Sequence, residues 1–288
     1  MPNAPRPPQC AGDALAVDLH LHSNASDGCD PPRRVVERAR AAGLRAISLT
    51  DHDTLGGLAE ARAEAARLGL EFIDGVELSS AHEGRLVHIL GHFIRPDAPA
   101  LLGQIARYRR QRILRMDRML GRLREAGIPI DPEDFLRLYG GAPSLGRGQL
   151  GAYLVERGFV RTREEAFERF IGEEGPAFVP WEMISPAEAV RLIVEAEGAA
   201  TFAHPALSGA DEILPGLVSA GLAGIEVDHP SQDDAARRRY RELASRHGLL
   251  CMGGSDCHGA RPGPERLGRH NQPMRLLARL RERSRAAR

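Results

Sequence analysis

Several short apolar runs in this sequence end in a histidine or a carboxylate. They lie at 17–22, 46–52, 72–77, 86–92, 200–204, 225–229 and 249–256. Each run has the length and the residue types of a β-strand, and helical segments such as 58–68 separate most of them. Strands that alternate with helices predict parallel βα units, whose active sites lie at the carboxyl ends of the strands.

The alternation stops between residues 97 and 177, where apolar side chains recur with helical spacing. The longest such set is Leu101, Leu102, Ile105, Tyr108, Ile113, Met116, Leu120 and Leu123. Strand patterns of comparable quality are missing from this stretch. We therefore predict an α/β barrel made of 14–96 and 178–288, a helical insertion at 97–177, and a loose N-terminal tail at 1–13.

Composition narrows the class of protein. Lys+Arg and Asp+Glu both number 39, so the zero formal net charge excludes a globally basic nucleic-acid coat. The sequence has no lysine, which excludes Schiff-base and P-loop chemistry. The uncharged run 213–225 is too short to cross a bilayer, and the Pro-rich start lacks the apolar core of a secretory signal. We expect a cytoplasmic protein with no membrane contact and no obligate protein partner.

Cysteine usage agrees with a reducing compartment. The four cysteines, Cys10, Cys29, Cys251 and Cys257, are scattered and form no CxxC pair.

The period of a β-strand groups the polar side chains. Residues two apart share a face, so His20 and His22 point together into the barrel mouth while Leu19 and Leu21 pack away from it. The same parity groups Asp256 with His258 and turns Cys257 aside.

The side chains collected at the strand ends form a candidate metal site. The set is His20, His22, Asp27, His52, Glu77, His88, His204, Asp256 and His258. Imidazoles and carboxylates without thiolates suit Mn, Zn or Fe. Sites with several metal ions usually serve hydrolysis, because the ions activate water and neutralise phosphoryl or acyl oxygens. We predict two to three divalent ions.

Each of these residues also has a simpler explanation. An isolated HxH is often an ordinary pair of strand histidines, His52 could cap the next helix, and His88 could be a core residue. The joint interpretation is favoured by position, since separate strands would each have to end in a ligand type by chance. Asp51, His92 and His229 are expected to orient ligands or substrate.

The motifs resemble those of the PHP (polymerase and histidinol phosphatase) superfamily of metal-dependent phosphoesterases. They are Asp-Leu-His-Leu-His-Ser at 18–23, Ser-Asp-Gly at 26–28, Thr-Asp-His-Asp-Thr at 50–54, Gly-Val-Glu-Leu-Ser at 75–79, Val-His-Ile-Leu-Gly-His at 87–92, Ala-His-Pro at 203–205 and Gly-Ser-Asp-Cys-His-Gly at 254–259. The insertion and the stretch 224–229 are most similar to the subgroup of 3′,5′-nucleoside bisphosphate phosphatases and the 5′→3′ exoribonuclease RNase AM.

The resemblance implies a distorted (β/α)7 barrel with the helical insertion over its mouth, and a site for three ions with Mn²⁺ favoured. It assigns His20, His22, Glu77 and Asp256 to the first ion, a bridging Glu77 with His88 and His204 to the second, and Asp27, His52 and His258 to the third. It implies a phosphoric ester hydrolase that removes the 3′-phosphate of 3′,5′-bisphosphonucleotides or cleaves short RNA from its 5′ end.

The sequence departs from the subgroup at two places. Gly146-Arg147-Gly148-Gln149 stands where the subgroup has Gly-Arg-Pro-His, so Arg147 is kept and Gln149 replaces a histidine. Asp228 replaces an aromatic residue that could stack on a base. We predict Arg147 and His229 as catalytic residues, with Arg147 and Gln149 also binding substrate.

Arginines in the insertion could attract an anionic substrate, a nucleotide or the 5′ end of a short RNA. Arg107 and Arg110 are the candidates for direct contact, although a solvated helix face explains them as well. Two other functions stay open: a phosphodiesterase or phosphatase for cyclic or sugar phosphates, and a non-catalytic PHP module that serves as a scaffold.

Overall fold

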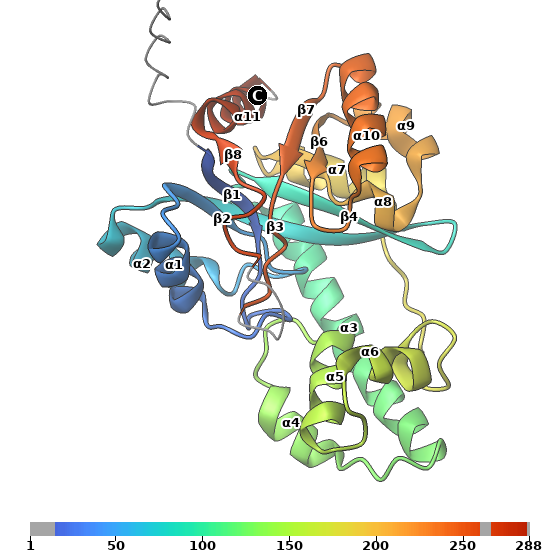
Figure 1. The fold of residues 1–288 in the computed structure, drawn as a ribbon. Coiled ribbons are helices and arrows are strands. Elements are labelled where there is room, and N and C mark those ends of the chain that lie inside the picture. The colour runs from blue at the N-terminus through green and yellow to red at the C-terminus, as the bar shows by residue number, and fades with distance from the viewer. Residues whose placement is uncertain (1–14, 260–265, 287–288) are drawn as a thin grey trace, which may run out of the picture.

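The computed structural model describes residues 15–259 and 266–286. The predicted tail at 1–13 and Cys10 lie outside these residues. One sheet of eight strands curls into a nearly closed barrel, in the order β7-β6-β5-β4-β3-β2-β1-β8 (Figure 1). The strands are β1 (Leu15–Leu21), β2 (Ala46–Leu49), β3 (Glu71–His82), β4 (Arg85–His92), β5 (Ala199–Phe202), β6 (Leu222–Asp228), β7 (Leu250–Gly253) and β8 (Gln272–Pro273). The predicted α/β barrel is confirmed, with the short β8 as an eighth strand.

Strand β4 corrects the expectation of parallel units throughout. It pairs antiparallel with both β3 and β5. The cause is a two-residue turn at Glu83 and Gly84, which have φ values of 49° and 79°. Positive φ at both central positions makes a type I′ hairpin turn, which joins antiparallel strands. The first half of β4 therefore lies at the barrel mouth, and His88 reaches it from that half.

Helices cover the outside of the barrel (Figure 1). They are α1 (Pro32–Ala41), α2 (Leu58–Leu68), α7 (Pro186–Glu195), α8 (Pro205–Ser208), η2 (Asp211–Ile213), α9 (Leu214–Ser219), α10 (Asp234–His247) and α11 (Met274–Ala286). Helix α1 illustrates why they form, because Pro32 opens it and Val35, Val36 and Ala39 form one buried stripe. That stripe packs on Leu21 and Ile47 of the sheet.

The remaining helices lie together below the barrel in Figure 1. They are α3 (Pro99–Glu125), α4 (Pro132–Tyr139), α5 (Arg147–Glu156), α6 (Arg163–Ala166) and the π-turn η1 (Phe167–Ile171). Met119, Phe135 and Tyr153 belong to a core of their own, whereas Leu101 at the start of α3 packs into the core of the barrel. The exact limits of the insertion, 97 and 177, stay a prediction.

Not all of the apolar side chains predicted to share one face of a helix in the insertion are buried. Ile113 is 49% exposed, while Tyr108, Met116 and Leu120 of the same set are buried. In the part of the chain that the structure describes, no helix has the length and apolar character needed to cross a membrane.

Candidate metal centre and phosphate site

Glu77 lies at the centre of the site and is fully buried on β3. Its two carboxylate oxygens lie 3.0–3.2 Å from ring nitrogens of five histidines. These are His20, His22 and His52 at Oε2, and His88 and His204 at Oε1. One carboxylate facing five imidazoles is suited to bridge metal ions, because it compensates charge at more than one position.

Several of these nitrogens lack a hydrogen bond. Both ring nitrogens of His22, and the Nδ1 atoms of His52 and His88, are buried without a hydrogen-bond partner among the described residues. They approach carboxylates closely but not in hydrogen-bonding geometry. Buried polar atoms are rarely left unpaired, so the donor set fits divalent metal ions held between the rings and the carboxylates.

Two groups of ligand atoms can be distinguished by depth. The inner group, His20, Glu77 and His204, is almost fully buried, and the outer group, His22, Asp27, His52 and His258, lies nearer the solvent. In each group the ligand atoms lie within 4.8 Å of one another. His52 with Glu77 and His88, and His20 with His229 and Asp256, make two further groups. All nine predicted ligands therefore meet at the mouth, although which ion each one binds stays a proposal.

The pleat of β1 explains the convergence. His20 and His22 both lie 3.2 Å from the same Glu77 oxygen, while Leu19 and Leu21 belong to two separate apolar clusters. The predicted pairing of Asp256 and His258 also holds, with 3.5 Å between Oδ1 and Nδ1. Cys257 turns away and packs with Leu21, as the parity predicts.

Glu226 on β6 is a site residue that the sequence interpretation missed. It is fully buried, its Oε1 lies 3.0 Å from Nδ1 of His20, and its Oε2 accepts a hydrogen bond from the backbone of His204 at 2.8 Å. A carboxylate behind a metal-binding histidine fixes the ring and raises its basicity. The signal was present, because Glu226 lies in a run that was already assigned as a strand ending in polar residues.

Burial and mutual charge shift the pKa values of the site. Burial opposes the charged form of His22, but the nearby carboxylates of Asp256 and Glu77 raise its pKa to about 10. Burial lowers the pKa of His52 to about 3. Burial also disfavours ionisation of Glu77, but the facing His52 and His20 hold the pKa of its carboxyl well below the usual range. The metal-free site therefore holds protons on some rings and not on others.

Asp51 and His92 take supporting positions. Asp51 accepts hydrogen bonds from the Ser23 hydroxyl and from the Ser26 hydroxyl, both at 2.6 Å, and so fixes the loop that carries Asp27. His92 lies at the opposite end of β4 from His88, with its Nε2 3.0 Å from the carbonyl oxygen of Leu19. It thus contacts the backbone beside His20 and not a ligand ring.

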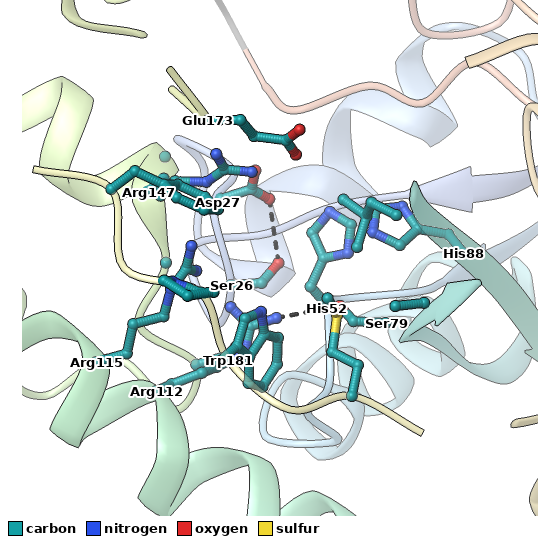
Figure 2. Close-up of a pocket in the computed structure, with 18 of the residues that line it drawn as sticks. Ser26, Asp27, His52, Ser79, His88, Arg112, Arg115, Arg147, Glu173 and Trp181 are labelled. Carbon is teal, nitrogen blue, oxygen red and sulfur yellow. Dashed lines mark hydrogen bonds between the residues drawn. The ribbon is translucent and has the colours of Figure 1, made fainter. Parts of the chain in front are cut away.

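A cavity of about 360 Å³ opens beside the outer group. His52 and His88 line one side, and Arg112, Arg115 and Arg147 of the insertion line the other together with Trp181, while Asp27 lies beside Arg147 (Figure 2). The cavity therefore joins metal-ligand side chains to a wall of guanidinium groups.

Aromatic rings and backbone carbonyls hold these arginines. Arg147 lies over the rings of Phe167 and Phe178, with 5.5 and 5.3 Å from Cζ to the ring centroids. Arg112 lies 4.7 Å over Trp181. Arg115 donates from Nε to the carbonyl of Val179 at 2.6 Å. Burial, together with the neighbouring Arg147 and Arg112, lowers the pKa of Arg115 to about 9.

The other predicted substrate residues lie differently. Arg107 and Arg110 are exposed on α3 and do not line the cavity. Gln149 lines it, but its amide is bonded to the protein, because Nε2 donates to the carbonyls of Ser26 and Ser144 and Oε1 accepts from the backbone of Gly146. The sequence interpretation missed Arg112 and Arg115, which share the face of α3 that Tyr108 and Met116 mark as buried.

Comparison with known proteins places the chain in a family. The model of the PHP domain matches residues 18–130. A phosphoribosyl 1,2-cyclic phosphate 1,2-diphosphodiesterase of Eggerthella lenta is 37% identical over 85% of this chain and 95% of its own. A 3′,5′-nucleoside bisphosphate phosphatase of Chromobacterium violaceum is 34% identical over 91% of this chain and 94% of its own. The 5′-3′ exoribonuclease Rnm of Escherichia coli is 33% identical over 89% of both chains.

A solved structure agrees with these relatives. A chain from Bifidobacterium adolescentis, described as a metal-dependent phosphoesterase, superposes with a TM-score of 0.87 and 31% identity over 94% of this chain and 96% of its own. The predicted enzyme class, a phosphoric ester hydrolase that uses divalent metal ions, is confirmed at the level of the family. The chain belongs to the PHP family, as its strand-end motifs indicate.

Proposed function

We propose that this enzyme hydrolyses a phosphate ester of a ribose that carries a second phosphate. The first substrate class is the 3′,5′-bisphosphonucleotides, with the 3′-phosphoryl group transferred to water and the ribose 3′-oxygen as the leaving group, and the 5′ end of short RNA offers the same chemistry. The observation that carries the proposal is the pair of opposite walls in one cavity, metal-ligand side chains on one side and three arginines on the other.

The arginine wall offers guanidiniums to both phosphates, Arg147 to the reacting ester and Arg112 and Arg115 to the phosphate that does not react. The three arginines line the cavity together with the acidic Asp27 and Glu173, and Arg112 also pairs with Asp53. A guanidinium binds two phosphate oxygens at once, and partial burial strengthens such contacts. Trp181 lines the same cavity and offers an aromatic surface to a base or a sugar.

Two to three divalent ions, with Mn²⁺ as the proposed metal, would activate water and neutralise the oxygens of the reacting phosphate. The inner and outer groups would hold them. The residues of the chain then orient the ester: Arg147 binds its non-bridging oxygens, and the closed base of the barrel limits the approach of bulk water.

His229 is proposed to hold a proton for the reaction. Its Nδ1 accepts a hydrogen bond from the backbone N–H of Ser231 at 3.1 Å, so the neutral ring carries its proton on Nε2. That nitrogen is buried and lies 3.4 Å from Oδ2 of Asp256. A ring with this tautomer is a donor and not a metal ligand. The variant His229→Gln should therefore lose activity without losing an ion, and loss of an ion would identify His229 as a ligand.

A second candidate is a cyclic ribose phosphate that carries another phosphate. The relative from Eggerthella lenta, at 37% identity, is named for such a substrate. The same two walls would bind it, with the cyclic phosphate toward the metal ligands. Asp228 in place of an aromatic residue removes one base-stacking position and is compatible with a substrate that has no base.

The test is a comparison of substrates matched in all but one phosphate. Mn²⁺-loaded protein is assayed with 3′,5′-bisphosphoadenosine, 3′-AMP, 5′-AMP, phosphoribosyl 1,2-cyclic phosphate, and an oligoribonucleotide with and without its 5′-phosphate. We expect kcat/KM to fall by about 10²-fold or more when the second phosphate is removed, as for loss of a preorganised donor. Equal rates for 3′-AMP and the bisphosphate would contradict the two-phosphate proposal.

A further inference from the structure

The inner and outer metal groups differ in what supports their ligands. His20 and His204 of the inner group are both fixed by Glu226, which is a residue of the barrel. Two ligands of the outer group, Asp27 and His52, are instead next to contacts with the helical insertion. We propose that the insertion builds the outer metal position, so that affinity for the outer ion depends on how α5 and α3 pack on the barrel. The inference rests on the proposed binding of more than one ion.

The first contact is the close approach of α5 to Asp27. A Cβ added to Gly148 would lie 2.9 Å from Cβ of Asp27 and 3.2 Å from its Oδ2. Asp27 Cβ is fixed close to the backbone, so it cannot yield as the tip of a flexible side chain would. The first turn of α5 therefore sets the position of the Asp27 carboxylate, and only glycine leaves room for it.

The second contact is made by Gln149, the next residue of α5. Its Nε2 donates to the carbonyl of Ser26, the residue before Asp27, and Gln149 is buried. The backbone N–H of Ser144 donates to the carbonyl of Ala25 at 3.1 Å in the same region. The loop that carries Asp27 is thus bonded to Asp51 of the barrel on one side and to the insertion on the other.

The third contact lies beside His52. Asp53 is buried with φ of 52°, and its carboxylate accepts from the backbone and hydroxyl of Ser79 at 2.7 and 2.8 Å. Arg112 of α3 pairs with the same carboxylate. The hydroxyl of Tyr108, also on α3, donates to the carbonyl of Ser79 at 2.7 Å. Helix α3 therefore helps to hold the positive φ of Asp53, which is the residue that follows His52 in the chain.

Gly148 and Gln149 are accordingly positioning residues for the outer ion. Groups that orient metal ligands typically change metal affinity by about 10- to 100-fold when they are altered. The inner ion should not respond to them, because Glu226 and the strands hold its ligands.

The test compares two glycines of the same helix. Gly148→Ala pushes a methyl group against Asp27, whereas Gly151→Ala places one at an ordinary 3.5 Å from Ile171 and Phe167. Both changes replace a glycine of α5 with a better helix former, and they differ in the contact with Asp27. Metal-free protein is titrated with Mn²⁺, and bound ions are counted by calorimetry and by the electron paramagnetic resonance of free Mn²⁺.

We expect Gly148→Ala to weaken one ion by about 10- to 100-fold and to leave the others unchanged. Gly151→Ala should match the unmodified protein. Gln149→Ala, which removes the bond to Ser26 without adding bulk, should weaken the same ion. Wild-type binding of every ion by both Gly148→Ala and Gln149→Ala would overturn the inference. Ion counting uses no substrate, so the result stands apart from whether the proposed substrates are hydrolysed.

Discussion

The barrel and the insertion supply one cavity with different kinds of side chain. The barrel contributes imidazoles and carboxylates from strands, where residues two apart are held by the pleat. The insertion contributes guanidiniums on long side chains that rest on aromatic rings. The strands give ligand positions with little freedom, as metal binding requires, while the arginines are held by contacts within and beside the insertion. Binding of the inner ion should therefore respond to barrel variants, whereas binding of the outer ion and recognition of substrate should respond to insertion variants as well.

Glu77→Gln is expected to have the largest effect, because it removes the one carboxylate that faces five histidines. We expect kcat/KM to fall by at least about 10³-fold, since more than one ion loses charge compensation. Metal analysis should find fewer ions per chain, and circular dichroism should report a retained fold. Most of the activity surviving in this variant would show that Glu77 is not a bridge.

Arg147 tests the opposite wall. The simplest alternative is an ion pair with Glu156, but the Arg147 guanidinium instead lies over the rings of Phe167 and Phe178. Arg147→Ala and Arg147→Lys should both lower kcat/KM by about 10²-fold, because a lysine offers a point charge and not a planar fork. The number of bound ions should stay unchanged. Full activity of Arg147→Lys would contradict a contact of the planar guanidinium with two phosphate oxygens. Loss of metal in either variant would show that Arg147 also supports metal binding.

The difference between barrel and insertion also explains what the sequence could predict. The metal ligands of the barrel were predicted because short strands end in polar residues, and because residues two apart on a strand, such as His20 and His22, point to the same side. The direction of β4 was missed although Glu83-Gly84 carries the signal of a tight hairpin. That direction decides that His88, and not His92, reaches the mouth.

The insertion was harder to predict, because the sequence offers many arginines and only the phase of α3 selects among them. Tyr108, Arg112 and Arg115 lie on one side of that helix, while Arg107 and Arg110 face solvent. Because the exposed Ile113 was grouped with the buried apolar residues, the sequence did not show which side of α3 faces the cavity. The role of Gln149 depends on contacts with Ser26, more than a hundred residues away in the chain, which no local pattern contains.

Glu226→Gln sharpens the comparison within the barrel. The amide keeps the shape and can still accept from the backbone of His204, but it loses the charge that faces His20. We expect the affinity for the inner ion to fall by about 10- to 100-fold. Asp228→Asn is the matched control on the same strand, because Asp228 pairs with Arg237 and Arg241 outside the site. An inner affinity unchanged by Glu226→Gln would contradict the assignment of Glu226 as a support.

The pH dependence of metal binding follows from the shifted pKa values of the ligand histidines, which are raised at His20 and His22 and lowered at His52. In the metal-free protein, the raised pKa of His22, about 10, means that a proton occupies the ring at neutral pH and must leave when an ion binds. Affinity should therefore strengthen as pH rises between about 6 and 8, by up to about tenfold per pH unit for each displaced proton. His52 is neutral over this range, because its pKa is about 3, and releases none. Calorimetry in buffers of different ionisation enthalpy counts the protons, and zero release would contradict the shift at His22.

The smallest effect is expected at Arg107 and Arg110. Both are exposed, and Arg107 pairs only distantly with Glu182, at 3.9 Å. The double variant Arg107→Ala/Arg110→Ala removes charge from the approach to the cavity but no contact inside it. We expect kcat/KM to change by less than about threefold at 0.15 M salt, since exposed charges are screened over about 8 Å. The change should grow at low salt, where a long-range field speeds association with an anionic substrate. A loss as large as that of Arg147→Ala, and independent of salt, would mean that these arginines touch the substrate, and that α3 presents a different face to the cavity when substrate is bound.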